Sequence, residues 1–255
     1  MKRFITCLGI GLGLVFWQIA CKPETTNNDP QYIIDQSLKA HGSKVFDQSI
    51  IEFKIGNRFY KSTRSQGQFR YERFWDSIGV TIHDDLTNNG LVRQIDQTEI
   101  ILDTKKIDNY SSSLRLTMYH FALPFGFNDP AVIKTYLGEV ILMEEPYHKI
   151  KISFKLNPND RTIHDNVYIA WIHKKKFTMD YLAYVLNEPE DKATYFMQVV
   201  DAKKIEGFRV QDYKVFKPTQ DSLFTRPEDL DQAWAASQLI EWSAFKVNQL
   251  KIRPK

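Results

Sequence analysis

Residues 166–186 read NVYIAWIHKKKFTMDYLAYVL, and this stretch decides the fold class. A basic turn at 174–176 separates two segments in which apolar residues occupy both alternating sets of positions. Successive side chains of a strand point to opposite faces, and an open antiparallel sheet normally turns one polar face to water. Because these two strands are apolar on both faces, we expect other elements to cover both sides of the sheet here.

The residues on either side of this stretch also alternate with a period of two. Ile51, Phe53 and Ile55 alternate with more polar residues, and the pair Gly56-Asn57 is typical of a two-residue hairpin turn. Similar short strands follow up to residue 102 and again from 139 to 216, without the strand–helix–strand alternation of parallel sheets. The sequence therefore predicts an antiparallel meander.

Three places interrupt the strands with helical signals. Asp29 and Pro30 begin a helix that Gly42 ends. An insertion at 111–137 combines a helix capped near Ser111, an apolar loop at 123–127 and a second short helix at 130–137. A last helix is expected from Pro227 to about residue 236. We therefore predict an α+β fold with one domain at 29–255: a strongly curved antiparallel sheet, or incomplete β-barrel, with a few helices packed on its concave face as a lid.

The first residues carry an export pattern. Lys2 and Arg3 precede an apolar run at 4–17, which is too short and too rich in glycine to be a permanent membrane span. The run ends at Gln18-Ile19-Ala20-Cys21, which resembles the lipobox cut by the lipoprotein signal peptidase, although Gln18 stands where that motif usually has leucine. The resemblance implies a signal peptide at 1–20, lipidation of Cys21 and a flexible tether at 21–28.

Cysteine content and charge exclude several classes of function. Cys7 and Cys21 are the two cysteines, so a processed chain has no disulfide, thiol nucleophile or cysteine metal site. Loss of Lys2 and Arg3 lowers the net charge from +3 to near +1. Charges of both signs are scattered, and no basic face of the kind that nucleic acid requires is evident. We therefore expect neither a nucleic-acid partner nor a cofactor.

The order of the predicted elements resembles the LolA/LolB family of periplasmic lipoprotein carriers and outer-membrane receptors. The shared features are the capped helix at 29–42, a run of strands, the helix-and-loop insertion at 111–137, further strands and a late helix. A helix followed by Gly42 and the segment Leu123-Pro124-Phe125 also resemble uncharacterised envelope lipoproteins of Bacteroidetes-type bacteria. The resemblance implies a half-barrel with an apolar interior for acyl chains. Because Lys22 follows Cys21, where an aspartate would signal inner-membrane retention, it also implies the outer membrane, facing the periplasm.

The sequence lacks the common catalytic motifs for hydrolysis, phosphate binding and dinucleotide binding. Two histidine–aspartate pairs, His83-Asp84 and His164-Asp165, occur in the repeated string Thr-Ile-His-Asp. Such a pair could act as metal ligands or as a base with its orienting carboxylate. Turn or strand-end roles explain the same residues more simply. We assign no catalytic or metal-binding residue and keep an envelope hydrolase as an alternative.

Aromatic residues at alternating strand positions favour binding of a hydrophobic ligand. The membrane anchor and the apolar loop at 123–127 point the same way, because exposed apolar loops are uncommon unless they pack on or bind something. We expect a non-enzymatic envelope lipoprotein that binds a lipid or the acyl chains of a lipoprotein in an apolar cavity. A structural subunit of an envelope complex, with an unknown protein partner, is a further alternative. The predicted ligand-binding residues are Phe53, Phe69, Tyr71, Phe125, Phe127, Trp171, Tyr181 and Tyr184.

Overall fold

The computed structural model describes residues 28–155, 167–188, 191–219 and 226–255. The strands form two seven-stranded sheets, which we call sheet A and sheet B. Sheet A has the order β14-β1-β2-β3-β4-β5-β6, and sheet B has the order β13-β12-β11-β10-β9-β8-β7. All paired neighbours are antiparallel, as the meander predicts.

The strands of sheet A are β1 (Ser49–Ile55), β2 (Arg58–Ser65), β3 (Gln68–Ser77), β4 (Val80–Thr87), β5 (Gly90–Ile95), β6 (Thr98–Ile100) and β14 (Asn248–Pro254). The strands of sheet B are β7 (Val132–Leu142), β8 (Glu145–Phe154), β9 (Tyr168–His173), β10 (Met179–Glu188), β11 (Asp191–Ile205), β12 (Phe208–Pro218) and β13 (Leu239–Phe245). The helical elements are α1 (Pro30–His41), α2 (Lys44–Gln48), α3 (Thr104–Ala122), η1 (Phe125–Asn128), η2 (Pro227–Asp229) and α4 (Leu230–Ala235).

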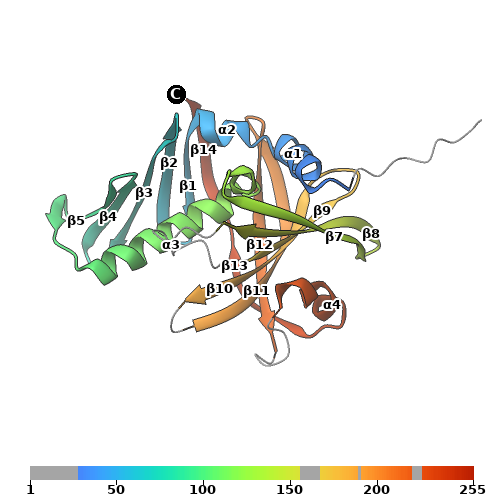
Figure 1. The fold of residues 1–255 in the computed structure, drawn as a ribbon. Helices are drawn as coiled ribbons and strands as arrows, with labels where there is room; N and C mark the ends of the chain where they lie inside the picture. Colours follow the sequence, from blue (N-terminus) through green and yellow to red (C-terminus); the bar gives the residue numbers. More distant parts are fainter. Residues whose placement is uncertain (1–27, 156–166, 189–190, 220–225) are drawn as a thin grey trace, which may run out of the picture.

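The chain passes from sheet B to sheet A between β13 and β14. Val247 lies in this connection, is buried, and donates its backbone N–H to Oδ1 of Asp212 at 2.8 Å. The two sheets curve around α1, α2 and α3 without closing into a barrel (Figure 1). The predicted α+β class and the curved antiparallel architecture are confirmed, with α1, α2 and α3 on the concave side, whereas the late helix α4 packs on the opposite face of sheet B.

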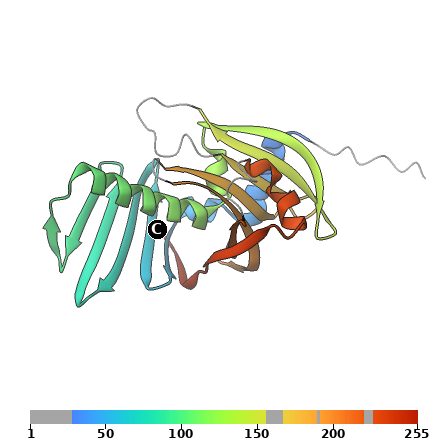
Figure 2. The ribbon, with the colours of Figure 1, turned by 90° about the horizontal axis from the view of Figure 1, so that it is seen from below.

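Helix α3 lies across the strands of sheet A (Figures 1 and 2). Its apolar stripe includes Leu114, Met118 and Phe121, which pack with Phe53 and Leu86 of the sheet. We call the face of each sheet that is turned toward α1 and α3 the inner face, and the opposite face the outer face. Ion pairs cover much of the outer face of sheet A, including Lys61–Glu72 at 3.1 Å.

Sheet B is covered on both faces, as the stretch at 166–186 predicts. On the inner face, Tyr168 and Leu182 pack with Ile33 of α1. On the outer face, Trp171 packs in a second cluster with Leu230 of α4. All six residues of β9 are buried. The late helix therefore provides the outer cover, while the earlier helices lie on the inner side.

The start of α1 and its end at Gly42 agree with the sequence. Asp29 caps the first turn by accepting from the backbone N–H of Gln31 at 3.1 Å. Gly42 has a φ of +64°, and a Cβ at this position would lie 1.9 Å from the carbonyl oxygen of Gly207. Only glycine therefore fits the left-handed end of α1 against the hairpin between β11 and β12.

Two predictions within the insertion are wrong. Helix α3 begins at Thr104 instead of near Ser111, because the Asp103 carboxylate caps it through the backbone N–H of Lys106 at 2.8 Å. The second short helix predicted at 130–137 is part of strand β7. The β-branched residues Val132 and Ile133 favour a strand, and burial along this segment alternates with a period of two.

Candidate functional site

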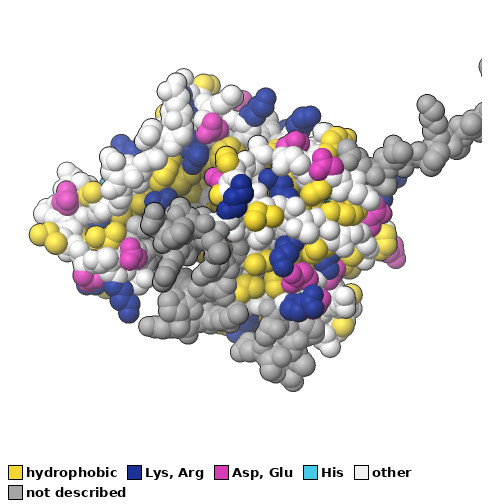
Figure 3. All heavy atoms as spheres, in the orientation of Figure 1, with side chains coloured by type: hydrophobic (Ala, Val, Ile, Leu, Met, Phe, Trp, Pro, Cys, Tyr) yellow, Lys and Arg dark blue, Asp and Glu magenta, His cyan; other side chains and the backbone are white. Residues whose placement is uncertain are grey.

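Four aromatic side chains gather on the inner side of sheet A, where α2 and η1 approach the strands. Phe46 of α2 lies 5.0 Å from Phe125 of η1, and Phe69 lies 4.7 Å from Tyr71 on β3, both measured between ring centroids. Phe69 and Phe125 are half-buried, whereas Phe46 and Tyr71 are buried. We call Phe46, Phe69, Tyr71 and Phe125 the aromatic rim. Hydrophobic side chains gather on this part of the surface, with Lys and Arg side chains at their edge (Figure 3).

The layer beneath the aromatic rim is filled by side chains. Phe53 of β1 stacks on Phe121 of α3, with ring centroids 3.8 Å apart, and on Tyr60 of β2 at 5.2 Å. These three residues are at least nine-tenths buried. The half-buried rings of the rim, rather than the packed layer below, are therefore the apolar surface that a ligand can reach without unfolding the core.

A buried charged cluster holds α3 on the far half of sheet A. Asp84 accepts from Arg73 at 2.6 Å and from Arg93 at 2.6 Å, and all three side chains are buried. Arg73 also donates to the hydroxyl of Ser113 on α3 at 3.0 Å. The Arg93 guanidinium lies 3.5 Å from the ring centroid of Tyr110 on the same helix. Each charge has partners in the structure, so this cluster has a structural role.

The eight predicted ligand-binding residues fall into three places. Phe69, Tyr71 and Phe125 belong to the aromatic rim, and Phe53 lies directly beneath it. Phe127 and Tyr184 belong to the core between α1 and sheet B. Trp171 and Tyr181 lie on the outer face of sheet B, under α4. The structure thus brings four of these residues together at sheet A and places the other four elsewhere.

The pair His83-Asp84 does not form a base with its orienting carboxylate. The two residues are neighbours on β4, so their side chains point to opposite faces of the sheet. His83 lies 3.5 Å from Glu72 on the outer face, while Asp84 is held by two arginines on the inner face. The other pair, His164-Asp165, lies outside the described residues.

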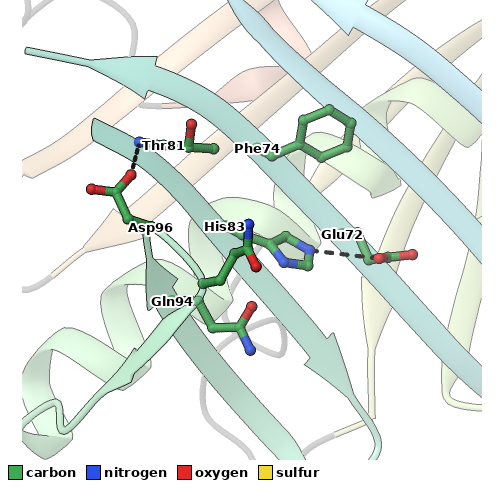
Figure 4. Close-up of a pocket in the computed structure, with 7 residues that line it drawn as sticks. Glu72, Phe74, Thr81, His83, Gln94 and Asp96 are labelled. Atoms are coloured by element: carbon green, nitrogen blue, oxygen red, sulfur yellow. Dashed lines mark hydrogen bonds and ion pairs between the residues drawn. The ribbon is translucent and has the colours of Figure 1, made fainter. Parts of the chain in front are cut away.

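An open pocket of about 390 Å³ surrounds His83 on the outer face of sheet A (Figure 4). It is formed mainly by hydrogen-bonding side chains: Glu72, Thr81, His83, Gln94, Asp96 and Gln97, with Phe74 as its aromatic member. Asp96 accepts from the backbone N–H of Thr81 at 2.8 Å. A bound acyl chain would remove the Glu72 and Asp96 carboxylates from water, so this pocket suits a hydrophobic ligand less well than the aromatic rim does.

The interior between α3 and sheet B disfavours charge. Burial lowers the pKa of His120 to about 4, and its Nε2 atom has no hydrogen-bond partner. Burial likewise raises the pKa of the neighbouring Tyr119 phenol. His41, at the end of α1, accepts from the backbone N–H of Met179 at 3.0 Å, and its pKa is lowered by burial to about 3. All three groups are uncharged at neutral pH.

Within the described ranges, no group of three or more His, Cys, Asp or Glu side chains is placed to hold a metal ion. In the same part of the chain, no helix combines the length and apolar character needed to cross a membrane.

Two arginines beside the aromatic rim were missed by the sequence analysis. Arg64 of β2 lies over Phe46, Tyr71 and Phe125, and Arg115 of α3 lies over Phe69. Because 51 positions separate them in the chain, no local motif joins them. The available signal was Arg64 itself, which falls in the inward-facing set of β2 with Tyr60 and Ser62.

Several solved structures are similar to this chain over most of their length. A LolA superfamily protein from Nitrosomonas europaea has 12% identity and a TM-score of 0.47, covering 89% of this chain and 94% of that one. A domain described as an outer membrane lipoprotein-sorting protein, from Vibrio parahaemolyticus, has 7% identity, a TM-score of 0.44 and coverages of 88% and 93%. A DUF1329 family protein from Desulfovibrio piger has 8% identity, a TM-score of 0.43 and coverages of 87% and 92%. Similarity at this level assigns no activity to the chain.

Among curated protein sequences, none matches this chain. A family match extends over residues 22–239 and therefore includes β1 to β12, the aromatic rim and the buried charged cluster. The chain belongs to the DUF6503 family, a family of unknown function.

Proposed function

We propose that this protein is a membrane-anchored envelope lipoprotein that binds a hydrophobic ligand, a lipid or a lipoprotein acyl chain, at the aromatic rim of sheet A. The observation that carries this proposal is the position of Phe69 and Phe125. Both rings are half-buried beside a closely packed apolar layer, and they come from segments far apart in the sequence. Each acyl methylene removed from water contributes about 0.8 kcal/mol, so contact with a few rings and methylenes is enough for measurable binding.

The binding role needs no catalytic group, and the geometry disfavours the hydrolase alternative at His83-Asp84. A base and the carboxylate that orients it must share a hydrogen bond. The inner-face arginines hold Asp84, on the opposite side of the sheet from His83. A non-enzymatic carrier or receptor is the function that the remaining features support best.

The anchor is part of the proposal and rests on the sequence at residues 1–28, of which 1–27 lie outside the described residues. Lipidation of Cys21 would place the binding domain beside a membrane, where lipid ligands are abundant. The mass of the mature protein tests this directly, since a diacylglyceryl group on Cys21 adds a defined increment. Cys21→Ser should release the protein from the membrane fraction, and an unchanged membrane fraction would contradict the anchor.

Native mass spectrometry with lipid extraction tests the binding role. The protein is purified in mild detergent from the envelope of its host, beside the variants Phe125→Asp and Ile141→Asp. Ile141, on edge strand β7, is 68% exposed and serves as a control for adding a charge at an apolar surface. We expect a lipid adduct in the wild type and in Ile141→Asp, and its loss in Phe125→Asp. A folded wild-type protein that carries no lipid and takes up no acyl probe would overturn the proposal.

One observation favours the second candidate, a subunit of an envelope complex. Strand β7 is an edge of sheet B and exposes Ile133, Leu137 and Ile141. Apolar side chains on an exposed edge strand are typical of a surface that pairs with another protein. A partner captured by in-cell crosslinking that is lost in Ile141→Asp, together with an unchanged lipid content, would favour this candidate.

A further inference from the structure

Two guanidinium groups lie against the rings of the aromatic rim. The Cζ atom of Arg64 is 5.3 Å from the ring centroid of Phe125, 5.8 Å from that of Phe46 and 5.9 Å from that of Tyr71. The Cζ atom of Arg115 is 5.0 Å from the ring centroid of Phe69. These contacts place the two guanidinium groups beside the rings of the apolar surface. A ligand that lies on these rings would therefore meet them.

The positive charges beside the rim exceed the negative ones. Arg64 donates through Nε to Asp47 at 3.3 Å and through Nη1 to the hydroxyl of Tyr71. The Asp47 side chain is 47% exposed, so water screens this ion pair. Arg115 has no ion pair within the part of the chain that the structure describes. Of the two arginines, Arg64 alone thus has a carboxylate partner among the described residues, and that carboxylate is solvated.

Both arginines act on the same phenol. Burial raises the pKa of Tyr71, and the positive charges of Arg64 and Arg115 oppose that rise. Arg64 lies over Tyr71 and Arg115 lies over Phe69, and the centroids of these two rings are 4.7 Å apart, so both arginines border the same corner of the rim.

We infer that the aromatic rim selects amphipathic ligands with an anionic head group, a phosphate or a carboxylate, which pairs with Arg64 and Arg115 while the chain lies on Phe69 and Phe125. This inference rests on the proposed function. Guanidinium groups bind both anions through paired, charge-assisted hydrogen bonds. The apolar rings exclude part of the water, which strengthens such a pair relative to one in bulk solvent.

The other charged groups of the inner face support this assignment by contrast. Arg73 and Arg93 are buried and are already paired with Asp84, so they have little capacity for a ligand. The layer behind the rim consists of buried apolar side chains, Phe53, Tyr60 and Phe121, and it would penalise a buried anion. A charged head group is therefore held by the arginines at the edge of the rim, while the chain lies on the half-buried rings.

Three ligands with the same chain length test the inference on the full-length protein: dodecanol, laurate and dodecyl phosphate. Each displaces the neutral fluorescent probe N-phenyl-1-naphthylamine from the wild type and from Arg64→Gln, Arg115→Gln and Arg70→Gln. Arg70, the control, is on the outer face of sheet A, where it pairs with Asp85 at 2.8 Å. We expect Arg64→Gln and Arg115→Gln each to lower the affinity for one or both anionic ligands about tenfold. Neither substitution should change the affinity for dodecanol. Arg70→Gln should match the wild type.

The outcomes separate this inference from the proposed function. Dodecanol binding combined with unchanged anion affinities in both rim variants would overturn the head-group inference and leave hydrophobic binding intact. No displacement by any of the three ligands in the wild type would overturn the proposed function as well. If the inference holds, a preference for dodecyl phosphate indicates a phospholipid as the source of the head group, and a preference for laurate indicates a free fatty acid.

Discussion

Sheets A and B have the same number of strands but bury them differently. In sheet B, α1 and α4 cover opposite faces, and all six residues of β9 are buried. In sheet A, the outer face is exposed to solvent and carries ion pairs. The inner face is packed under α3 but leaves the rings of Phe69 and Phe125 half-buried at the aromatic rim. Phe74, on the outer face of β3, is 38% exposed.

This difference separates stability from binding. A sheet packed on both faces gains apolar burial on each side, but it has little apolar surface left for a ligand. Sheet A buries less apolar surface on its outer face, and its inner face keeps partly exposed aromatic rings. We therefore interpret sheet B as the scaffold and the rim of sheet A as the binding surface.

The largest effect on stability is expected for Trp171→Ala. Trp171 is fully buried between sheet B and α4, and its ring lies 5.5 Å from that of Phe196. The free energy of unfolding should fall by about 3–5 kcal/mol, the usual cost of truncating a buried tryptophan. Trp242→Ala is the matched control, because Trp242 is 57% exposed and its loss should cost less than about 1 kcal/mol. Urea unfolding measures both, and similar losses would contradict the interpretation of sheet B as the scaffold.

A second large effect concerns neighbouring aspartates on β4. Asp84→Asn leaves Arg73 and Arg93 buried without a countercharge and should cost about 3 kcal/mol or more. Asp85→Asn removes an ion pair with Arg70, which is half exposed, and should cost less than about 1 kcal/mol. Equal unfolding midpoints in urea for the two variants would show that the buried charged cluster does not hold sheet A to α3.

Acidification should destabilise the protein through its buried histidines. The pKa of His120 is 6.5 in the unfolded chain and about 4 in the folded protein, because burial disfavours the charged ring. The contribution of His120 to the free energy of unfolding is therefore fully present above pH 6.5. It is lost as the pH falls from 6.5 toward 4. Protonation of His120 alone should lower the free energy of unfolding by about 2 kcal/mol between pH 7 and pH 5. His120→Phe should remove that part of the slope, and an unchanged slope would exclude His120 as its source.

The smallest effect on stability is expected at the rim itself. Phe69→Ala removes a half-buried ring and should lower the free energy of unfolding by only about 1–2 kcal/mol. Phe53→Ala, directly beneath the rim, should cost about 3–5 kcal/mol, because Phe53 is buried and stacks on Phe121. Acyl-probe binding should nevertheless be weakened by Phe69→Ala. Unfolding curves and probe titrations on the same samples distinguish the two roles, and intact probe affinity in Phe69→Ala would count against the rim.

Much of the architecture could be predicted from the sequence because it depends on local periodicity. The apolar alternation around Trp171 predicted a cover on both faces, and Gly42 predicted the end of α1. Strand β7 was mistaken for a helix because Pro130 begins the segment in the manner of a helix start, whereas sheet pairing with β8 decides its conformation. Tertiary pairing of this kind overrides local signals.

The site was harder to predict because its parts come together only through the fold. Alternation placed Phe69 and Tyr71 on one face, but it could not show that Trp171 and Tyr181 lie on the outer face of another sheet. The charged cluster did leave a signal. Arg73, Asp84 and Arg93 each fall in the inward-facing set of an adjacent strand, and opposite charges at such positions indicate a buried ion pair.

Photo-crosslinking with a diazirine analogue of palmitate tests most directly whether the rim of sheet A is the binding surface. The probe is activated on the full-length protein, and labelled peptides are mapped by mass spectrometry, with and without excess palmitate as competitor. We predict competable labels at the rim, on the peptides that carry Phe69, Tyr71 and Phe125. Labels confined to the outer face of sheet B, around Trp171 and Tyr181, or labels that palmitate does not compete, would contradict the account.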